Sequence, residues 1–201
     1  MLELLAPAGN LDAVIAAVQN GADAVYMGFG DGFNARRSAD NFTRESFAKA
    51  VRYCHIRGCK VYVTLNTLVG DREMDAAAAL AQQASDAGAD AILVQDLGLA
   101  RVLRDALPDI PLHASTQMSI HNLAGVEAAA EMGITRAVLA RELSLEQIRF
   151  ISQHASIETE VFVHGALCFC YSGQCYMSAL IGRRSGNRGA CAQPCRMQYL
   201  S

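Results

Sequence analysis

The stretch Gly21-Ala-Asp-Ala-Val25 returns almost unchanged as Gly88-Ala-Asp-Ala-Ile92, and Gly133-Ile-Thr-Arg-Ala-Val138 is a looser copy. In each copy a glycine follows a segment with helical spacing and precedes an apolar run, which is typical of a helix end that leads into a strand. When one helix-to-strand junction is repeated, parallel strands joined by right-handed helical crossovers are expected. The three copies therefore predict an α/β fold.

Short apolar segments alternate with helical ones along the whole chain. The predicted strands cover residues 2–6, 24–28, 60–66, 91–95, 112–116, 136–140 and 157–164. The predicted helices cover residues 11–20, 44–57, 71–87, 97–107, 123–132 and 145–154. Thr43 and Ser144 stand where helix N-caps are expected. The unbroken alternation predicts one domain over residues 1–201, with a cysteine-rich loop at 165–196.

Polar side chains recur where the predicted strands end. They are Asn66, Gln95-Asp96, Ser115-Thr116-Gln117, Arg141-Glu142 and His164. A barrel brings all its strand ends to one rim, whereas an open sheet gathers only those beside its switch point. The pattern therefore favours a TIM-like (β/α) barrel. Only residues 196–201 are left to begin an eighth strand, so we expect a barrel that is truncated or incomplete at its C-terminus, within a longer protein.

The composition is that of a packed domain, because 52% of the 201 residues are hydrophobic and 18% are charged. The net charge of -3 gives no global case for binding nucleic acid, so any RNA contact would be local. No apolar run approaches the ~18 residues of a membrane span. Residues 1–7 lack the features of a signal peptide, and we therefore expect a cytoplasmic location.

Five of the seven cysteines lie between residues 168 and 195. Cys168, Cys175, Cys191 and Cys195 have the spacing C-x6-C-x15-C-x3-C, which suits a soft tetrahedral site. The C-x2-C pairs of zinc ribbons are absent. An iron–sulfur cluster, structural zinc and unligated thiols all stay open on the spacing alone. Cys170 alternates in face with Cys168, so we predict that it is not a ligand.

Several rim residues are candidates for chemistry. His164 could serve as a general acid or donate a hydrogen bond to a cluster sulfur, or it could be a capped core histidine. Arg141 could clamp a carboxylate or phosphate, or form a simple ion pair. His113 and Ser115 share a strand face and predict a polar inner layer. The candidate catalytic residues are His164, Arg141, Glu142, Asn66, His113 and Gln117.

Two further features bear on the substrate. Ser115 lacks the G-x-S-x-G context of a hydrolase nucleophile, so we do not expect it to act as one. Arginines are interleaved with the cysteines and could attract an anionic substrate despite the negative total charge. They are Arg183, Arg184, Arg188 and Arg196.

The chain resembles peptidase family U32, the collagenase-like proteins, from residue 1 to about residue 200. The most specific block runs from Phe162-Val-His-Gly-Ala-Leu-Cys168 through Tyr171-Ser-Gly-Gln-Cys175 to Asn187-Arg-Gly-Ala-Cys-Ala-Gln-Pro-Cys195. Glu3-Leu-Leu-Ala-Pro-Ala-Gly9 and Ala140-Arg-Glu-Leu-Ser144 support the resemblance.

The resemblance implies a function that the family name does not. Better understood members of this family hydroxylate a tRNA uridine, an rRNA cytidine or a ubiquinone-precursor ring without oxygen. They carry a 4Fe-4S cluster on four cysteines, which by position would be Cys168, Cys175, Cys191 and Cys195 here. The RNA branches are linked to prephenate, which suggests it as a co-substrate. The resemblance therefore implies an enzyme that hydroxylates a pyrimidine of tRNA or rRNA, with an unknown electron donor. A collagenase-like peptidase and a zinc-stabilised binding module are the alternatives.

Overall fold

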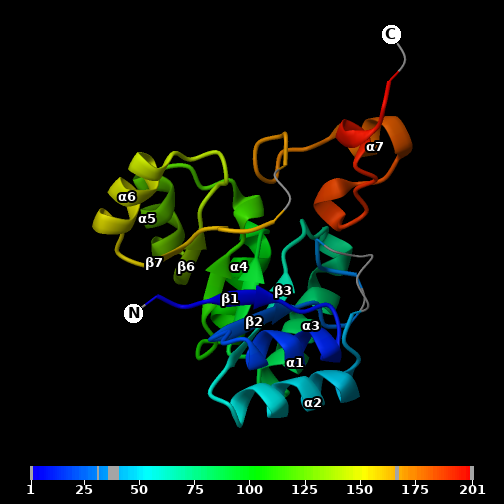
Figure 1. Cartoon of the computed structure of the whole chain (residues 1–201), viewed down its shortest axis with the longest axis vertical. Helices are drawn as coiled ribbons and strands as arrows, with labels where there is room; N and C mark the ends of the chain where they lie inside the picture. The colour runs from blue at the N-terminus through cyan, green and yellow to red at the C-terminus, as the bar shows by residue number, and fades with distance from the viewer. Residues whose placement is uncertain (1, 31, 36–40, 166–167, 200–201) are drawn as a thin grey trace.

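Seven parallel strands form the sheet of this protein, in the order in which they occur along the chain. The computed structural model describes residues 2–30, 32–35, 41–165 and 168–199. The strands are β1 (Leu5–Pro7), β2 (Ala24–Met27), β3 (Lys60–Leu65), β4 (Ala91–Val94), β5 (Leu112–Ala114), β6 (Ile134–Val138) and β7 (Glu158–Glu160). They curl into a TIM-like half-barrel, which confirms the predicted α/β class (Figure 1).

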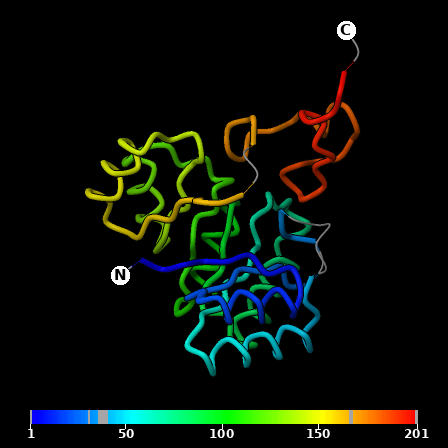
Figure 2. The backbone as a smooth tube through the Cα atoms, in the orientation of Figure 1, coloured from blue at the N-terminus to red at the C-terminus, as the bar shows by residue number. Residues whose placement is uncertain are grey.

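Helices follow six of the strands and pack against the outer face of the sheet. They are α1 (Leu11–Gln19), α2 (Arg44–His55), α3 (Met74–Asp86), α4 (Leu97–Ala106), α5 (Leu123–Glu131) and α6 (Leu145–His154). After β7 the chain forms a separate lobe with α7 (Met177–Gly182) and the short 3-10 helices η3 (Gly186–Arg188) and η4 (Pro194–Arg196). Figure 2 shows this lobe, residues 168–199, in orange and red beyond the end of the half-barrel.

The two faces of the sheet bury different side chains. Val61 and Val63 of β3 pack outward with α2, whereas Tyr62 between them belongs to the inner cluster with Leu93 and Val138. This alternation is expected for strands, whose side chains point to opposite faces in turn. The inner face also carries buried polar residues, so the centre of the half-barrel is partly polar.

The repeated Gly-Ala-Asp-Ala junction has a physical explanation in the structure. Gly21 and Gly88 end helices in the left-handed region, at φ +89° and +96°, where a residue without Cβ is favoured. The aspartate of each copy then accepts a backbone hydrogen bond beside the neighbouring strand. Asp23 accepts from Leu4 N and Asp90 from Val61 N, each at 2.7 Å. The repeat therefore combines a glycine that ends a helix with an aspartate that hydrogen-bonds to the neighbouring strand.

Some boundaries differ from the sequence prediction. The predicted strand 157–164 ends at Glu160, because the chain leaves the sheet there towards the lobe. The helix α7 was not predicted inside the cysteine-rich loop. Over the described residues, no eighth strand pairs with β1 or β7. In this same part of the chain no helix is long and apolar enough to cross a membrane. The predicted N-caps are confirmed, since Thr43 and Ser144 accept from Ser46 N and Gln147 N.

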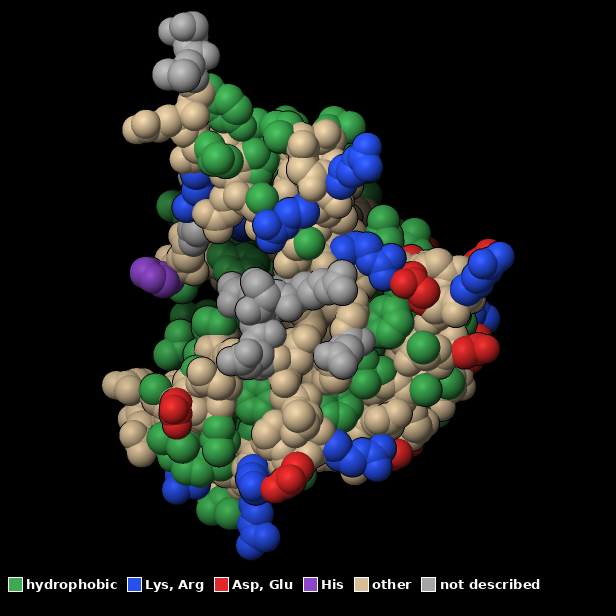
Figure 3. All heavy atoms as spheres, turned by 90° about the vertical axis from the view of Figure 1, so that its right-hand side faces the viewer, with side chains coloured by type: hydrophobic (Ala, Val, Ile, Leu, Met, Phe, Trp, Pro, Cys, Tyr) green, Lys and Arg blue, Asp and Glu red, His purple; other side chains and the backbone are tan. Residues whose placement is uncertain are grey.

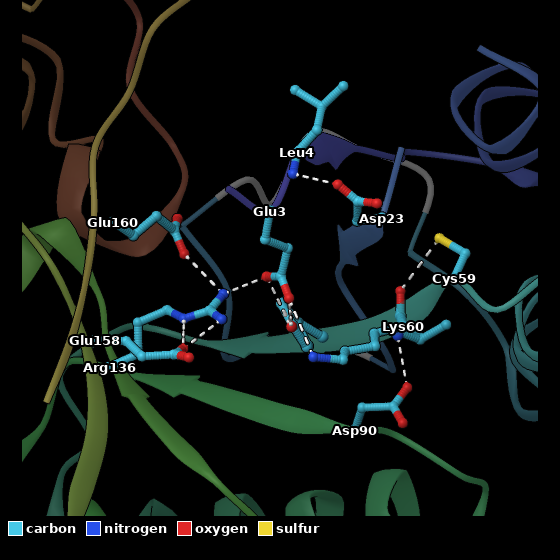
Figure 4. A network of polar contacts seen from close by, with 11 residues as sticks. Glu3, Leu4, Asp23, Cys59, Lys60, Asp90, Arg136, Glu158 and Glu160 are labelled. Carbon is cyan, nitrogen blue, oxygen red and sulfur yellow. Dashed lines mark hydrogen bonds and ion pairs between the residues drawn. The ribbon is translucent and has the colours of Figure 1, made fainter. Parts of the chain in front are cut away.

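An ion network centred on the buried Arg136 side chain ties the first strand to the last two (Figure 4). The Arg136 guanidinium on β6 donates to Glu3, which precedes β1, at 2.5 Å, and to Glu158 of β7 at 2.6 Å. Tyr62 and Lys60 of β3 also donate to Glu3. Burial disfavours ionised Glu3, but these hydrogen bonds outweigh it and lower its pKa to about 2.

Candidate functional site

A cavity of about 320 Å³ lies at the carboxyl ends of the strands, between the half-barrel and the lobe. Strand-end residues such as Asn66, Gln117 and Arg141 line one side, and residues 168–195 contribute to the other. Its volume is within the range of small-molecule sites. Its position matches the rim where (β/α) barrels carry their active sites.

All five clustered cysteines line this cavity. Cys168, Cys191 and Cys195 are exposed, and Cys170 and Cys175 are half-buried. A hydrogen bond between the Cys170 and Cys175 side chains raises the pKa of Cys170. The lobe therefore brings thiols that are far apart in sequence to one space.

The donor set suits a metal–sulfur group, because four thiols in the predicted spacing share the same cavity. In the described parts of the chain, no three His, Cys, Asp or Glu side chains are placed to hold a metal ion. Thiolates are the ligands of both 4Fe-4S clusters and structural zinc, so the residue types present fit either group. Residues 166–167 of the predicted cysteine-rich loop lie outside the described residues.

Ser172, between Cys170 and Cys175, attaches the lobe to the residues that follow β6. Its backbone N–H and hydroxyl both donate to the Glu142 carboxylate, at 2.5 and 2.8 Å. The backbone N–H and Nε of Arg141 each donate to the Ser172 hydroxyl at 3.3 Å. Burial opposes ionisation of Glu142, but the hydrogen bonds from Ser172 lower its pKa. Glu142 and Arg141 thus position the cysteine segment, and Arg141 also lines the cavity.

The next residue, Gly173, lies against the backbone of Gln117 in the barrel. A Cβ placed on it would lie 2.2 Å from the Gln117 carbonyl oxygen, and its φ is +76°. Only glycine meets both conditions without displacement of the chain.

Asn66 and Gln117 join several segments of the rim. The Asn66 Oδ1 accepts from Ala35 N at 2.9 Å, and its Nδ2 donates to Ser115 Oγ at 3.1 Å. Gln117 Nε2 donates to the Asn66 carbonyl at 2.9 Å. Both residues line the cavity, so the predicted polar rim is assembled around it.

The two candidate histidines lie elsewhere. His164 is exposed and is not among the described lining residues of the cavity. His113 is buried on β5, with its ring edge against Tyr62 at 4.9 Å between centroids, and it faces a second hollow shared with Arg136. Burial and the nearby Arg136 lower its pKa to about 3, which keeps the ring neutral at physiological pH. Among the described residues, neither histidine is part of the cavity lining.

Glu160 is a lining residue that the candidate set did not include. Its side chain is 18% exposed, and its buried Oε2 has no hydrogen-bond partner. Burial is the main cause of its raised pKa. The alternation Glu158-Thr-Glu160 is the sequence feature that indicates it, since two charged residues on one strand face are unusual inside a barrel.

The lobe is also held to the barrel by Arg188, which pairs with Glu73 at 2.7 Å. Glu73 ends the short 3-10 helix η1 (Asp71–Glu73) that precedes α3. Arg184 donates to the Ala190 carbonyl inside the lobe. Figure 3 shows basic side chains on the surface of the upper lobe, which by sequence are all arginines. This local positive surface stands beside the cavity although the net charge is negative.

A half-barrel with a cavity at its rim defines a TIM-like α/β protein, and sequence comparison gives the family. The model of "Peptidase family U32" matches residues 9–201. The chain belongs to peptidase family U32, as its motifs predict. A solved structure of the U32 peptidase Mk0906 superposes with a TM-score of 0.69 at 17% identity, covering 84% of this chain and 71% of that one, and so confirms the fold.

Two similar relatives are named for RNA hydroxylation. The 23S rRNA 5-hydroxycytidine C2501 synthase of Escherichia coli is 46% identical over 98% of this chain, which covers 30% of that enzyme. The tRNA hydroxylation protein P1 of Bacillus subtilis is 42% identical over 98% of this chain and is covered to 46%. The chain therefore spans less than half the length of these relatives.

Proposed function

We propose that this chain is the barrel of an Fe–S-dependent enzyme that hydroxylates a pyrimidine of tRNA or rRNA without oxygen. The observation that carries the proposal is the placement of Cys168, Cys175, Cys191 and Cys195 around one cavity at the polar rim of the half-barrel. The names of the similar relatives support the RNA substrate. Prephenate as a co-substrate is part of the same proposal.

The four cysteines would hold the cluster, which when bound supplies one-electron oxidation–reduction chemistry. Ser172 and Gly173 fix the loop between the first two of these cysteines against Glu142 and Gln117. Asn66 and Gln117 keep the opposite rim in place. Arg141 is positioned to bind an anionic group of the substrate, because its side chain lines the cavity.

A single RNA base suits the lining of the cavity. Phe162, Phe169 and Tyr171 contribute aromatic surfaces to it. Unpaired bases stack on such side chains, and each stacked base contributes about 1–3 kcal/mol. Basic side chains on the lobe would contact the phosphates that flank the base.

The lining favours hydroxylation over peptide hydrolysis. Among the described residues that line the cavity there is no histidine to activate a serine or cysteine. The Ser115 hydroxyl accepts from Asn66 Nδ2 instead. The peptidase alternative therefore gains no support from the site.

The test is nucleoside analysis of RNA by mass spectrometry. A strain that lacks the gene should lose a hydroxypyrimidine, and the wild-type gene should restore it. Cys191→Ser should fail to restore it, whereas Cys170→Ser, a matched control in the same cavity, should succeed. Unchanged hydroxypyrimidine content in the deletion strain would refute the RNA substrate.

A further inference from the structure

Glu160 and Arg141 are the charged side chains among the described residues that line the cavity, apart from the thiols. Arg141 lies just beyond the end of β6, and Glu160 is the last residue of β7. Glu160 pairs in register with Val138, which belongs to the inner cluster with Leu93, and all three residues line the cavity. A ligand that fills the cavity can therefore meet this carboxyl group.

In the ion network beneath the cavity, Glu160 lies farther from Arg136 than Glu3 and Glu158 do, and its Oε2 accepts no hydrogen bond. Arg136 donates through Nη1 to Glu3 and through Nε and Nη2 to Glu158. Its Nη1 is 3.6 Å from Glu160 Oε2, beyond hydrogen-bond distance. Two cations, Arg136 and Lys60, thus face the three carboxylates of Glu3, Glu158 and Glu160.

The excess carboxylate is the one that should carry a proton. Glu3 has the strongest set of donors and stays ionised, with a pKa of about 2. Glu158 is largely exposed and accepts two bonds from Arg136. Glu160 is largely buried, and burial raises its pKa; Arg136 acts in the opposite direction but, together with the raising effect of Glu3, does not outweigh burial. Its proton is best placed on the oxygen that faces away from the Arg136 guanidinium.

We propose that Glu160 is the base-recognising residue of the cavity: its protonated carboxyl group donates a hydrogen bond to a ring keto oxygen of the bound pyrimidine. The choice of ligand rests on the proposed function. A neutral carboxyl group can donate where a carboxylate only accepts. A keto oxygen buried against a carboxylate would be repelled, so the contact exists only in the protonated state.

Uridine is the probe, because it carries the ring without a titrating phosphate. Calorimetry should show that its affinity for the wild-type protein falls on the order of tenfold as the pH rises and Glu160 ionises. The other groups around Glu160 are Arg136, Lys60, Glu3, Glu158, Tyr62, His113, Arg141 and the cavity thiols. Glu3 and His113 have pKa values of about 2 and about 3, so they titrate below the pH at which Glu160 ionises.

The variants separate a binding role from a structural one. Glu160→Gln keeps a donor of similar shape and should bind uridine with no pH dependence over this range. Glu158→Gln is the companion variant on the same strand, outside the cavity lining; it removes one carboxylate from around Arg136 and should shift the pH dependence of uridine affinity to lower pH without abolishing it. If Glu160→Gln does not fold, the wild-type and Glu158→Gln profiles still decide.

A pH-independent uridine affinity in the wild-type protein, or no binding of uridine, would overturn the inference. A Glu158→Gln profile identical to that of the wild type would also overturn it. These results do not depend on iron or on RNA hydroxylation. A failed Glu160 experiment beside intact RNA hydroxylation therefore refutes only the base contact, whereas the RNA analysis tests the proposed function.

Discussion

Arg136 on β6 donates to Glu3 ahead of β1 at 2.5 Å, across the open side of the half-barrel. The Arg136 side chain is 9% exposed, and the same guanidinium binds Glu158 of β7. No described strand joins β1 to β7 by backbone hydrogen bonds. The ion network is thus the polar connection between the first strand and the last two.

Removal of the guanidinium should destabilise the fold strongly. In Arg136→Met, Glu3 and Glu160 lose their shared cation inside the half-barrel. Breaking a buried pair from one side costs about 3–5 kcal/mol. Urea unfolding should show this loss in the free energy of unfolding. Lys60→Met removes a cation from the same network whose side chain is more than half exposed, and it should cost less than about 1 kcal/mol. Equal losses in both variants would contradict the central place of Arg136.

Glu3 should make the protein sensitive to acid. Its pKa is lowered from the ordinary 4.5 to about 2, so its contribution to stability is present above pH 4.5 and is lost as the pH falls towards 2. Glu3→Gln should lower stability at neutral pH and should weaken the dependence of the free energy of unfolding on pH between about pH 4.5 and about pH 2. Urea unfolding at several pH values would measure this dependence. A slope identical to that of the wild type would count against the Glu3 contacts.

Glu160 should change stability with pH in the opposite direction to Glu3. Because its pKa is raised, its contribution is most favourable below the ordinary value of 4.5 and declines as the pH rises through the folded-state pKa. Glu160→Gln should therefore be more stable than the wild type at neutral pH, and the difference should vanish in acid. Thermal unfolding at two pH values would show this. A variant that is less stable than the wild type at neutral pH would disprove the raised pKa.

Gly173→Ala should loosen the cysteine segment. The new Cβ would meet the Gln117 carbonyl in a backbone conformation that favours glycine, at a local cost of about 1–3 kcal/mol. Hydrogen exchange of residues 168–175 should speed up while that of the half-barrel stays unchanged. Gly182→Ala is the control, because nothing lies within 4 Å of its added Cβ. Equal exchange in the two variants would mean that this contact does not hold the lobe.

The repeated junctions made the fold predictable, because Gly21 and Gly88 adopt the positive φ that ends a helix, and this requirement is visible in the local sequence. The helix caps at Thr43 and Ser144 are local in the same sense. The end of β7 was not predictable in this way, since residues 161–163 continue the apolar run but leave the sheet. Strand pairing there depends on a neighbour that the local sequence does not specify.

The candidate site was predictable in its residue types more than in its geometry. Asn66, Gln117, Arg141 and the cysteines were found from strand ends and spacing, and they line one cavity. The environment of Glu160 depends on how Arg136 is shared with Glu3 and Glu158, through contacts between residues 133 and 22 positions apart. Spacing along the chain carries no information on such competition.

The central claim is that the cavity cysteines hold a four-iron cluster. The direct measurement is iron and zinc content per chain after anaerobic purification and reconstitution, together with Mössbauer spectroscopy of the iron. About four irons per chain are expected. Cys168→Ser, Cys175→Ser, Cys191→Ser and Cys195→Ser should each lose the cluster, while Cys170→Ser should keep it. A colourless protein without iron, or one with stoichiometric zinc in its place, would contradict the account.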